Sequence, residues 1–286
     1  MKRGRKFLVA LACGALMIST SLAWAQKNKK SAPAAAADQG GPKPKSQAEA
    51  TAINAVIQAQ TPDDRLKAID NVLTKFSDTQ YKPMLLVMAM QTAEQKNDFA
   101  QTTFYAEQVL ESDPKNTFAD VTMASETARH TREFDLDKEE KLKKAEKYAH
   151  DAIENAPNTP KPRPDITDEQ WTATKKDLES QAHEALGMIA ALRKKYDDSI
   201  SEYKQSLEMA AQPDAGTYLR LGQTYLDAGK LDDANAAFDK AANMPNAAPA
   251  VKNIANAKKA EVAKLKAGGA APSAATGSAP GAPAKQ

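Results

Sequence analysis

The chain has 286 residues, of which 27% are charged and 6% are aromatic, and it contains one cysteine. A single cysteine excludes a framework of internal disulfides and a zinc site built from several cysteines. The net charge of +2 is unevenly spread, because residues 1–46 carry +8 while residues 47–266 carry −7. An acidic body argues against nucleic acid as a partner, since phosphate contacts require a basic face.

The N-terminus has the three parts of a bacterial secretory signal peptide at residues 1–25. The basic start MKRGRK is followed by the apolar stretch FLVALACGALMISTSL and by a small-x-small cleavage site that ends at Ala25. Cleavage there would remove Cys13, and we expect the mature protein in the periplasm or outside the cell. Two alternatives are an uncleaved membrane anchor and lipoprotein processing at Cys13, although Ala10 stands where a lipobox has leucine.

Two segments that flank the body lack apolar periodicity. Residues 26–46 are rich in Pro, Ala, Gly and Lys, and residues 267–286 are rich in Ala, Pro, Gly and Ser. Such compositions cannot bury enough apolar surface to fold. We therefore expect a disordered linker and a disordered tail, with residues 47–266 as the folded domain between them.

Helical patterns fill the folded domain, and the pattern from 218 to 245 recurs along it. In its clearest copy, an aromatic residue precedes Leu-Gly and a second aromatic, and alanines then flank Phe238. About 35 residues upstream, Gly187 and Tyr203 repeat Gly222 and Phe238. Together with fainter copies, this pattern predicts five units, which begin near Glu49, Pro83, Thr117, Ser180 and Ala215.

The pattern resembles the tetratricopeptide repeat, a helix–turn–helix unit of about 34 residues with small and aromatic residues at fixed offsets. The resemblance implies an all-α fold, an α-solenoid of about five helical hairpins closed by a C-terminal capping helix. The residues at the repeat-packing positions are Leu186, Gly187, Tyr203, Tyr218, Leu221, Gly222, Tyr225, Ala234, Phe238 and Ala241.

The motif residues are expected to have packing roles. Gly187 and Gly222 let the second helix of each hairpin approach closely, with Ala234 at the matching contact. The aromatic residues of the last unit, Phe238 among them, are expected to fill the space between neighbouring units.

Two insertions interrupt the repeat. About nine extra residues around 132–141 lie between the helices of the third unit, and residues 159–179 precede the fourth. In the second insertion, Thr167 and Gln170 predict a capping box for an unusually long helix that runs toward Arg193.

The segment after the fifth unit is predicted to be the capping helix that the open end of a solenoid needs. Its expected apolar stripe consists of Val251, Ile254, Val262 and Leu265, and lysines fill much of the remainder.

The sequence offers no constellation of residues for catalysis, for a cofactor or for a metal. The histidines at 130, 150 and 183 are too far apart for a helical metal site, and no nucleophile elbow or phosphate-binding loop is present. The acidic run 135–140 lacks the glycine of a calcium loop, and the basic run 141–147 is close enough to pair with it. We expect a solvated loop and a solvated helix face, and no enzymatic activity.

The remaining candidate site is the concave groove of first helices, which commonly binds peptides or protein surfaces in the tetratricopeptide-repeat family. One subtype of the family holds a C-terminal carboxylate with Lys and Asn, but Leu219, Gln223, Glu184 and Met188 occupy those positions here. The resemblance therefore implies a neutral, partly apolar groove for a protein or peptide partner. The expected groove residues are Val121, Ser125, Arg129, Glu184, Met188, Leu219 and Gln223.

The expected function is thus a non-enzymatic protein-interaction scaffold of the bacterial cell envelope. The alternative is a structural or assembly factor that an uncleaved signal or the basic linker tethers to the membrane. Neither hypothesis involves nucleic acid, and the partner, the pathway and the oligomeric state stay open.

Overall fold

The computed structural model describes residues 41–163 and 165–268. This part of the chain forms α-helices and one 3₁₀ helix without any β-strand, which confirms the predicted all-α class. The expected signal peptide, most of the expected linker and nearly all of the expected tail lie outside the described residues. The helices are α1 (Gln47–Gln58), α2 (Pro62–Lys75), α3 (Lys82–Gln95), α4 (Phe99–Ser112), α5 (Thr117–His130), α6 (Lys138–Asn155), η1 (Ala156–Asn158), α7 (Asp168–Leu192), α8 (Tyr196–Met209), α9 (Ala215–Asp227), α10 (Leu231–Asn243) and α11 (Pro249–Gly268).

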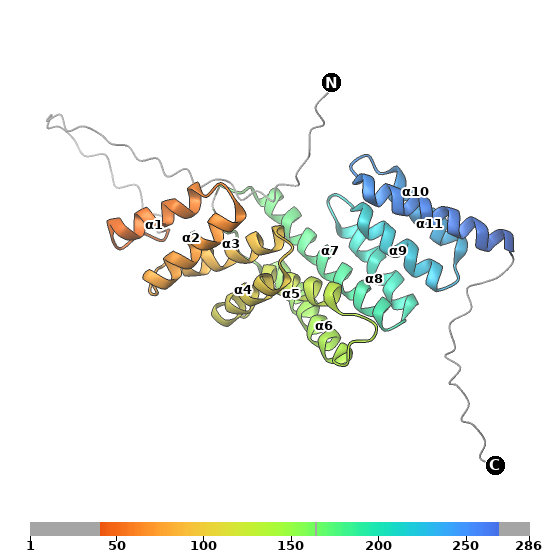
Figure 1. Ribbon diagram of the computed structural model, residues 1–286, viewed down its shortest axis with the longest axis horizontal. Helices are drawn as coiled ribbons and strands as arrows, with labels where there is room; N and C mark the ends of the chain where they lie inside the picture. The colour runs from red at the N-terminus through yellow and green to blue at the C-terminus, as the bar shows by residue number, and fades with distance from the viewer. Residues whose placement is uncertain (1–40, 164, 269–286) are drawn as a thin grey trace, which may run out of the picture. The chain divides into compact units, whose positions relative to one another are not determined.

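The helices belong to two compact units, which divide between Asp98 and Phe99. The first unit holds α1 to α3 and the second holds α4 to α11; Figure 1 labels and colours them in chain order. The two helices of the predicted second repeat, α3 and α4, therefore fall in different units.

In the first unit, α1 packs against α2 and α2 packs against α3. Ser46 caps α1 by accepting a hydrogen bond from the backbone N–H of Glu49, whose buried carboxylate accepts another from Thr79 Oγ1 at 2.6 Å. Lys45 forms an ion pair with Asp78 at 2.5 Å. The last residues of the expected linker are thus fastened to the loop that follows α2.

The same turn follows α3, α7 and α9. Its middle residue has a left-handed backbone, with a φ of 55° at Asn97, 61° at Lys194 and 73° at Gly229. The N–H of the next residue then donates back across the turn, as Lys230 N–H does to the Tyr225 carbonyl oxygen at 2.8 Å. This is the Schellman arrangement, in which a left-handed residue ends a helix.

A longer loop, 131–137, joins α5 to α6, and α6 has 18 residues where α8 has 14. The first predicted insertion is therefore divided: part of it is loop, and the part from Lys138 onward extends α6 by about one turn. Arg193 at the end of α7 donates to Glu139 at 2.8 Å and to Glu146 at 2.9 Å. These ion pairs attach the extended start of α6 to α7.

Helix α7 is long, at 25 residues, because it includes part of the second insertion. Thr167 and Gln170 form the predicted capping box, and the helix ends at Leu192, which confirms the sequence-based prediction. Just inside this helix, the indole N–H of Trp171 donates to the Thr159 carbonyl oxygen at 2.9 Å. Helix α7 packs against α5, α6 and α8, so the third and fourth helix pairs stack across the insertion.

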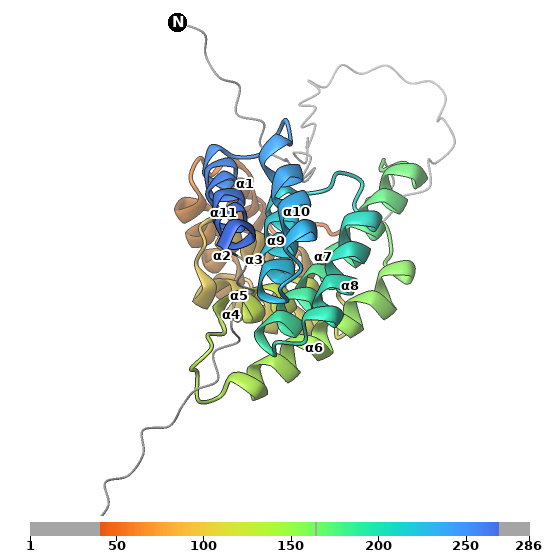
Figure 2. The same ribbon diagram turned by 90° about the vertical axis from the view of Figure 1, so that its right-hand side faces the viewer.

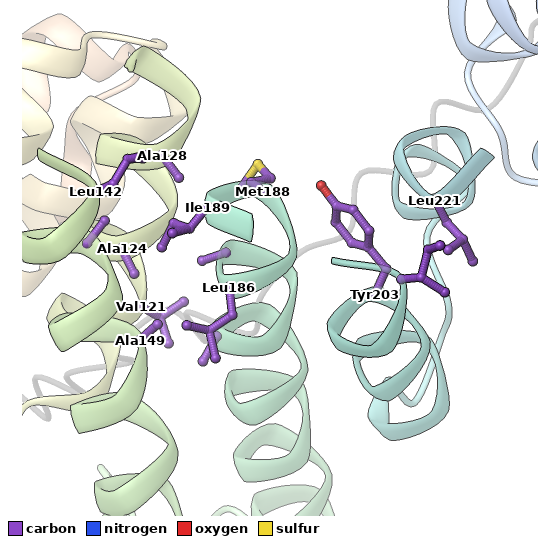
Figure 3. Packing of buried hydrophobic residues seen from close by; sticks show 14 of the residues in the cluster. Val121, Ala124, Ala128, Leu142, Ala149, Leu186, Met188, Ile189, Tyr203 and Leu221 are labelled. Atoms are coloured by element: carbon purple, nitrogen blue, oxygen red, sulfur yellow. The ribbon is translucent and has the colours of Figure 1, made fainter. Parts of the chain in front are cut away.

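The core of the second unit is one continuous apolar cluster. Val121, Ala149 and Leu186, labelled in Figure 3, bring α5, α6 and α7 together, and Tyr203 and Leu221 continue the cluster into α8 and α9. Many members are alanines, which allow the helix axes to approach closely.

The two glycines of the repeat motif lie against an aromatic ring of their own helix pair. A Cβ atom on Gly187 would stand 2.7 Å from Tyr203 Cδ1, and one on Gly222 would stand 2.6 Å from Phe238 Cδ1. Both rings are buried. The Phe238 ring thus packs within its own pair, against Gly222. Of the other motif residues, Tyr218 is half-buried, and Leu186, Leu221, Tyr225, Ala234 and Ala241 are buried.

Helix α11 packs mainly against α10, and Figure 2 shows the two side by side. Val262 is buried and Leu265 is half-buried, as expected for the apolar stripe of a capping helix, but Ile254 is 49% exposed. Ala255 takes the buried position, so that the buried stripe passes from Val251 through Ala255 to Val262 with a helical spacing.

Candidate functional site

The expected groove residues lie on the first helices of three successive pairs, α5, α7 and α9. Helix α7 contacts both α5 and α9, so the three helices form a row along the second unit. The structure divides the seven residues of this row into those that are packed beneath it and those that carry polar groups to its surface.

Four of the seven residues are packed into the unit. Val121 and Met188 belong to the apolar cluster, Ser125 is 8% exposed, and Leu219 is half-buried against the cluster. Val121 and Ser125 lie on α5, against which α7 packs. They therefore support the row of helices instead of forming an open lining.

Polar side chains of α7 and α9 reach the surface of the row and bind one another. Glu184 on α7 accepts a hydrogen bond from Arg220 on α9 at 2.5 Å, and Gln223 donates to Asp227 at 2.7 Å. Sequence reasoning missed Arg220 and Asp227. The four-residue spacing from Gln223 could have indicated Asp227, whereas the Glu184–Arg220 pair joins two helices and has no local signal.

A second charged group lies at the end of α5. Arg129 donates to the buried Glu126 at 3.1 Å, and the ring of His130 stacks on Phe99 with 4.1 Å between centroids. The Nδ1 atom of His130 is 3.0 Å from the Glu126 backbone oxygen. Of the expected groove residues, Arg129 is the most exposed, so its ion pair with Glu126 lies at the surface of the row.

A buried carboxyl group in the first turn of α5 was also missed. Asp120 is 1% exposed, and its Oδ2 atom has no hydrogen-bond partner in the described part of the chain. Burial raises its pKa to about 7, and the negative charge of Asp151 acts in the same direction. A hydrogen bond with the Asn155 side chain and the positive charge of Lys147 oppose that rise. The carboxyl group at the contact between α5 and α6 therefore has a pKa well above that of an ordinary aspartate.

The acidic run after α5 is a network of ion pairs. Lys141 binds Asp135 at 3.0 Å and Asp137 at 2.9 Å. The backbone N–H of Arg132, together with Lys141, holds the pKa of Asp135 below its usual value. Within residues 41–163 and 165–268, no group of three or more His, Cys, Asp or Glu side chains is arranged to hold a metal ion. No helix in these ranges combines the length and the apolar character needed to cross a membrane.

Comparison with known proteins identifies the repeat. Residues 215–247, which contain α9 and α10, match a family model described as tetratricopeptide repeat. Among solved structures, the chain is similar to TTC0263, described as a thermophilic TPR protein in Thermus thermophilus. The sequence identity is 17% and the TM-score is 0.50, over 76% of this chain and 100% of that one. Curated proteins give no match. Residues 215–247 thus match a tetratricopeptide repeat in sequence, and the fold of the chain is similar to that of a tetratricopeptide-repeat protein.

Proposed function

We propose that the chain is a non-enzymatic scaffold of the bacterial cell envelope that holds a segment of a partner protein against α5, α7 and α9. The observation that carries this proposal is the row of polar side chains on successive first helices, with Arg129 at one end and Gln223 at the other. Tetratricopeptide-repeat proteins commonly use this side of the fold to bind other proteins.

The chemistry of the row favours a protein segment with mixed character. The Glu184–Arg220 and Gln223–Asp227 contacts satisfy polar groups before a partner arrives, so an apolar side chain of the partner can rest on these helices without stranding a buried charge. Arg129 offers a cation to a carboxylate of the partner. Side chains that are fixed in advance lose little conformational entropy on binding, which favours affinity.

Site-specific photocrosslinking in the native bacterium tests where the partner binds. A photoreactive amino acid replaces Gln223 on α9 in one strain and Gln205, an exposed residue of α8, in another. We expect a discrete adduct to one protein from position 223 and none from position 205. Equal labelling from both positions, or no adduct from position 223, would contradict binding along α5, α7 and α9.

The envelope location rests on the signal-peptide pattern of residues 1–25. Sequencing the N-terminus of the mature protein from fractionated cells tests it. We expect Gln26 as the first residue, in a soluble periplasmic or extracellular fraction. An intact N-terminus in the membrane fraction would contradict this location and favour the alternative, an assembly factor tethered to the membrane. Recovery of the protein from the cytoplasm would exclude both proposals.

A further inference from the structure

The hydroxyl group of the buried Tyr203 side chain on α8 is open to solvent. The residue is only 2% exposed, because its ring packs on Gly187. Figure 3 shows the hydroxyl pointing toward α7, on the side of Met188. In the described ranges, Asp120 Oδ2 is the one fully enclosed side-chain nitrogen or oxygen atom without a hydrogen-bond partner. The Tyr203 hydroxyl makes no hydrogen bond within those ranges, so it is not enclosed and meets solvent.

The ion pair between Glu184 on α7 and Arg220 on α9 lies close enough to act on this hydroxyl. Burial raises the pKa of Tyr203, the positive charge of Arg220 opposes the rise, and the negative charge of Glu184 adds to it. The hydroxyl therefore stays protonated at neutral pH and can donate a hydrogen bond. The two charged side chains are also open to solvent, at 35% for Arg220 and 15% for Glu184.

The ion pair uses only one hydrogen-bonding atom of each side chain. Arg220 Nη1 donates to Glu184 Oε1 at 2.5 Å, and neither side chain makes a second hydrogen bond in the described part of the chain. A guanidinium group has five N–H donors, and a carboxylate has two acceptor oxygens. Donors of Arg220, the second oxygen of Glu184 and the Tyr203 hydroxyl therefore remain for another molecule.

A third charge lies near this ion pair, at the start of α9. A Cβ atom on Gly216 would stand 3.3 Å from Arg220 Nη1 and 2.6 Å from Asp214 Oδ2, so both groups lie beside this glycine. Asp214 also caps α9, since its carboxylate accepts a hydrogen bond from the Thr217 N–H at 3.2 Å. Arg220 is thus near two carboxylates, Asp214 and Glu184, and a carboxylate of a partner would meet like charge here.

We propose that Tyr203, Glu184 and Arg220 bind the side-chain amide of an asparagine or a glutamine in the partner segment. The inference rests on the proposed function and names the chemical group that this part of the row selects. The amide oxygen accepts hydrogen bonds from the Tyr203 hydroxyl and from an unused N–H of Arg220, and the amide N–H donates to Glu184. One neutral group thus matches the donors and the acceptor that the ion pair leaves unused.

Charged side chains of a partner match this site less completely. A carboxylate has no donor for Glu184 and adds a negative charge, whereas an ammonium group has no acceptor for Arg220 and adds a positive charge beside it. The main chain of the partner is also a poorer match, because the hydroxyl belongs to a residue that is only 2% exposed. A side chain reaches such a hydroxyl more readily than the backbone of a segment that lies across the helices.

Photocrosslinking from position 223 in the native bacterium tests the role of the hydroxyl. Tyr203→Phe removes the hydroxyl and keeps the ring that packs on Gly187. The matched control is Tyr218→Phe, at a half-buried tyrosine whose ring lies beside Lys240 of α10. We expect the adduct yield to fall about three- to tenfold in Tyr203→Phe, as for the loss of one hydrogen bond, and to stay unchanged in Tyr218→Phe. The urea midpoint of Tyr203→Phe should equal that of the wild type, because no hydrogen bond within the fold is lost.

The partner group is identified from the crosslinked segment, which mass spectrometry of the adduct locates. Each asparagine or glutamine of that segment is changed to leucine. We expect one such change to lower the adduct yield as Tyr203→Phe does, and the two changes together to lower it no further. An unchanged yield in Tyr203→Phe, a lowered urea midpoint, or coupling to a charged residue or to no side chain of the segment overturns the inference. A wild type without any adduct from position 223 contradicts the proposed function itself, and the inference with it.

Discussion

The ring of Phe238 lies flat against the position where Gly222 lacks a side chain, and a Cβ atom added there would stand 2.6 Å from two ring carbons. Real Cβ atoms do not approach other carbons so closely. The glycine is therefore a requirement of helix contact, since any side chain would push α9 and α10 apart. Gly187 and Tyr203 repeat this relationship between α7 and α8.

Gly222→Ala should therefore destabilise the protein, although alanine normally stabilises a helix interior by up to about 1 kcal/mol over glycine. We expect the free energy of unfolding in urea to fall by about 1–3 kcal/mol, because overpacking forces the Phe238 ring out of place. Gly268→Ala, whose Cβ would meet nothing within 4 Å, is the control and should change little. Stability equal to the wild type in Gly222→Ala would contradict the packing role.

Lys194→Gly should stabilise the protein. Lys194 has a φ of 61° in the turn after α7, where the equivalent residue after α9 is Gly229. A left-handed backbone costs a non-glycine residue about 1 kcal/mol, and the exposed Lys194–Glu133 pair that is lost contributes less than that. We expect a higher thermal midpoint for Lys194→Gly and a lower one for Gly229→Ala. Shifts of the two thermal midpoints in the opposite directions would show that the turns at Lys194 and Gly229 do not have the same backbone requirement.

Trp171→Ala should release the start of α7. The indole is buried, contacts Phe118 at 6.3 Å between ring centroids and donates to Thr159. We expect a loss of about 3–5 kcal/mol in unfolding free energy, typical of a deleted buried tryptophan. Faster hydrogen exchange should appear from Ala156 to the first turns of α7. Trp171→Phe keeps the ring and should retain most of the stability; if both variants lose equally, the hydrogen bond alone holds the segment.

Asp120→Asn should make the protein less sensitive to pH. The pKa of Asp120 is raised to about 7 in the folded chain from 3.8, so the folded state binds a proton that the unfolded state releases. Its stabilising contribution is present below about pH 4 and is lost as the pH rises to about 7. The asparagine variant avoids the buried charge, so its unfolding free energy relative to wild type should rise between pH 5 and pH 8 by about 2–4 kcal/mol.

The matched control for this prediction is Glu154→Gln, which changes an exposed carboxyl group on α6. Its effect on stability should be the same at pH 5 and at pH 8. An Asp120→Asn variant that behaves like this control would show that the buried carboxyl group is not protonated near neutral pH.

Features with a local cause were predictable from the sequence. Thr167 and Gln170, which are three residues apart, predict the capping box of α7. The glycines of the motif predict close contacts between helices. The partner of a side chain was harder to predict. Spacing places Phe238 on an inward face, but only the fold shows that this face meets Gly222 of the same pair.

The candidate site was less predictable than the fold. Repeat offsets placed Val121 and Met188 on the expected groove face, yet both are buried in the apolar cluster of the second unit. An acidic residue such as Asp120 is favoured in the first turn of a helix, so its position there gives no sign of burial. Nothing in the neighbouring sequence shows that α6 covers it. Burial between helices that are distant in sequence leaves no periodic signal.

The two ends of helix α7 contact different parts of the second unit. Its first turns are held by Trp171 and Lys175 against residues 157–159, and its later turns pack on α8 through Gly187 and Tyr203. In a repeat array each unit contacts only its neighbours, so stability is about the sum of the intrinsic stabilities of the units and the interface terms between them. A single uninterrupted helix that crosses a repeat boundary ties the opening of one side to the other. The third and fourth pairs should therefore melt as one cooperative foldon, and the insertion lengthens the array without creating a hinge in it.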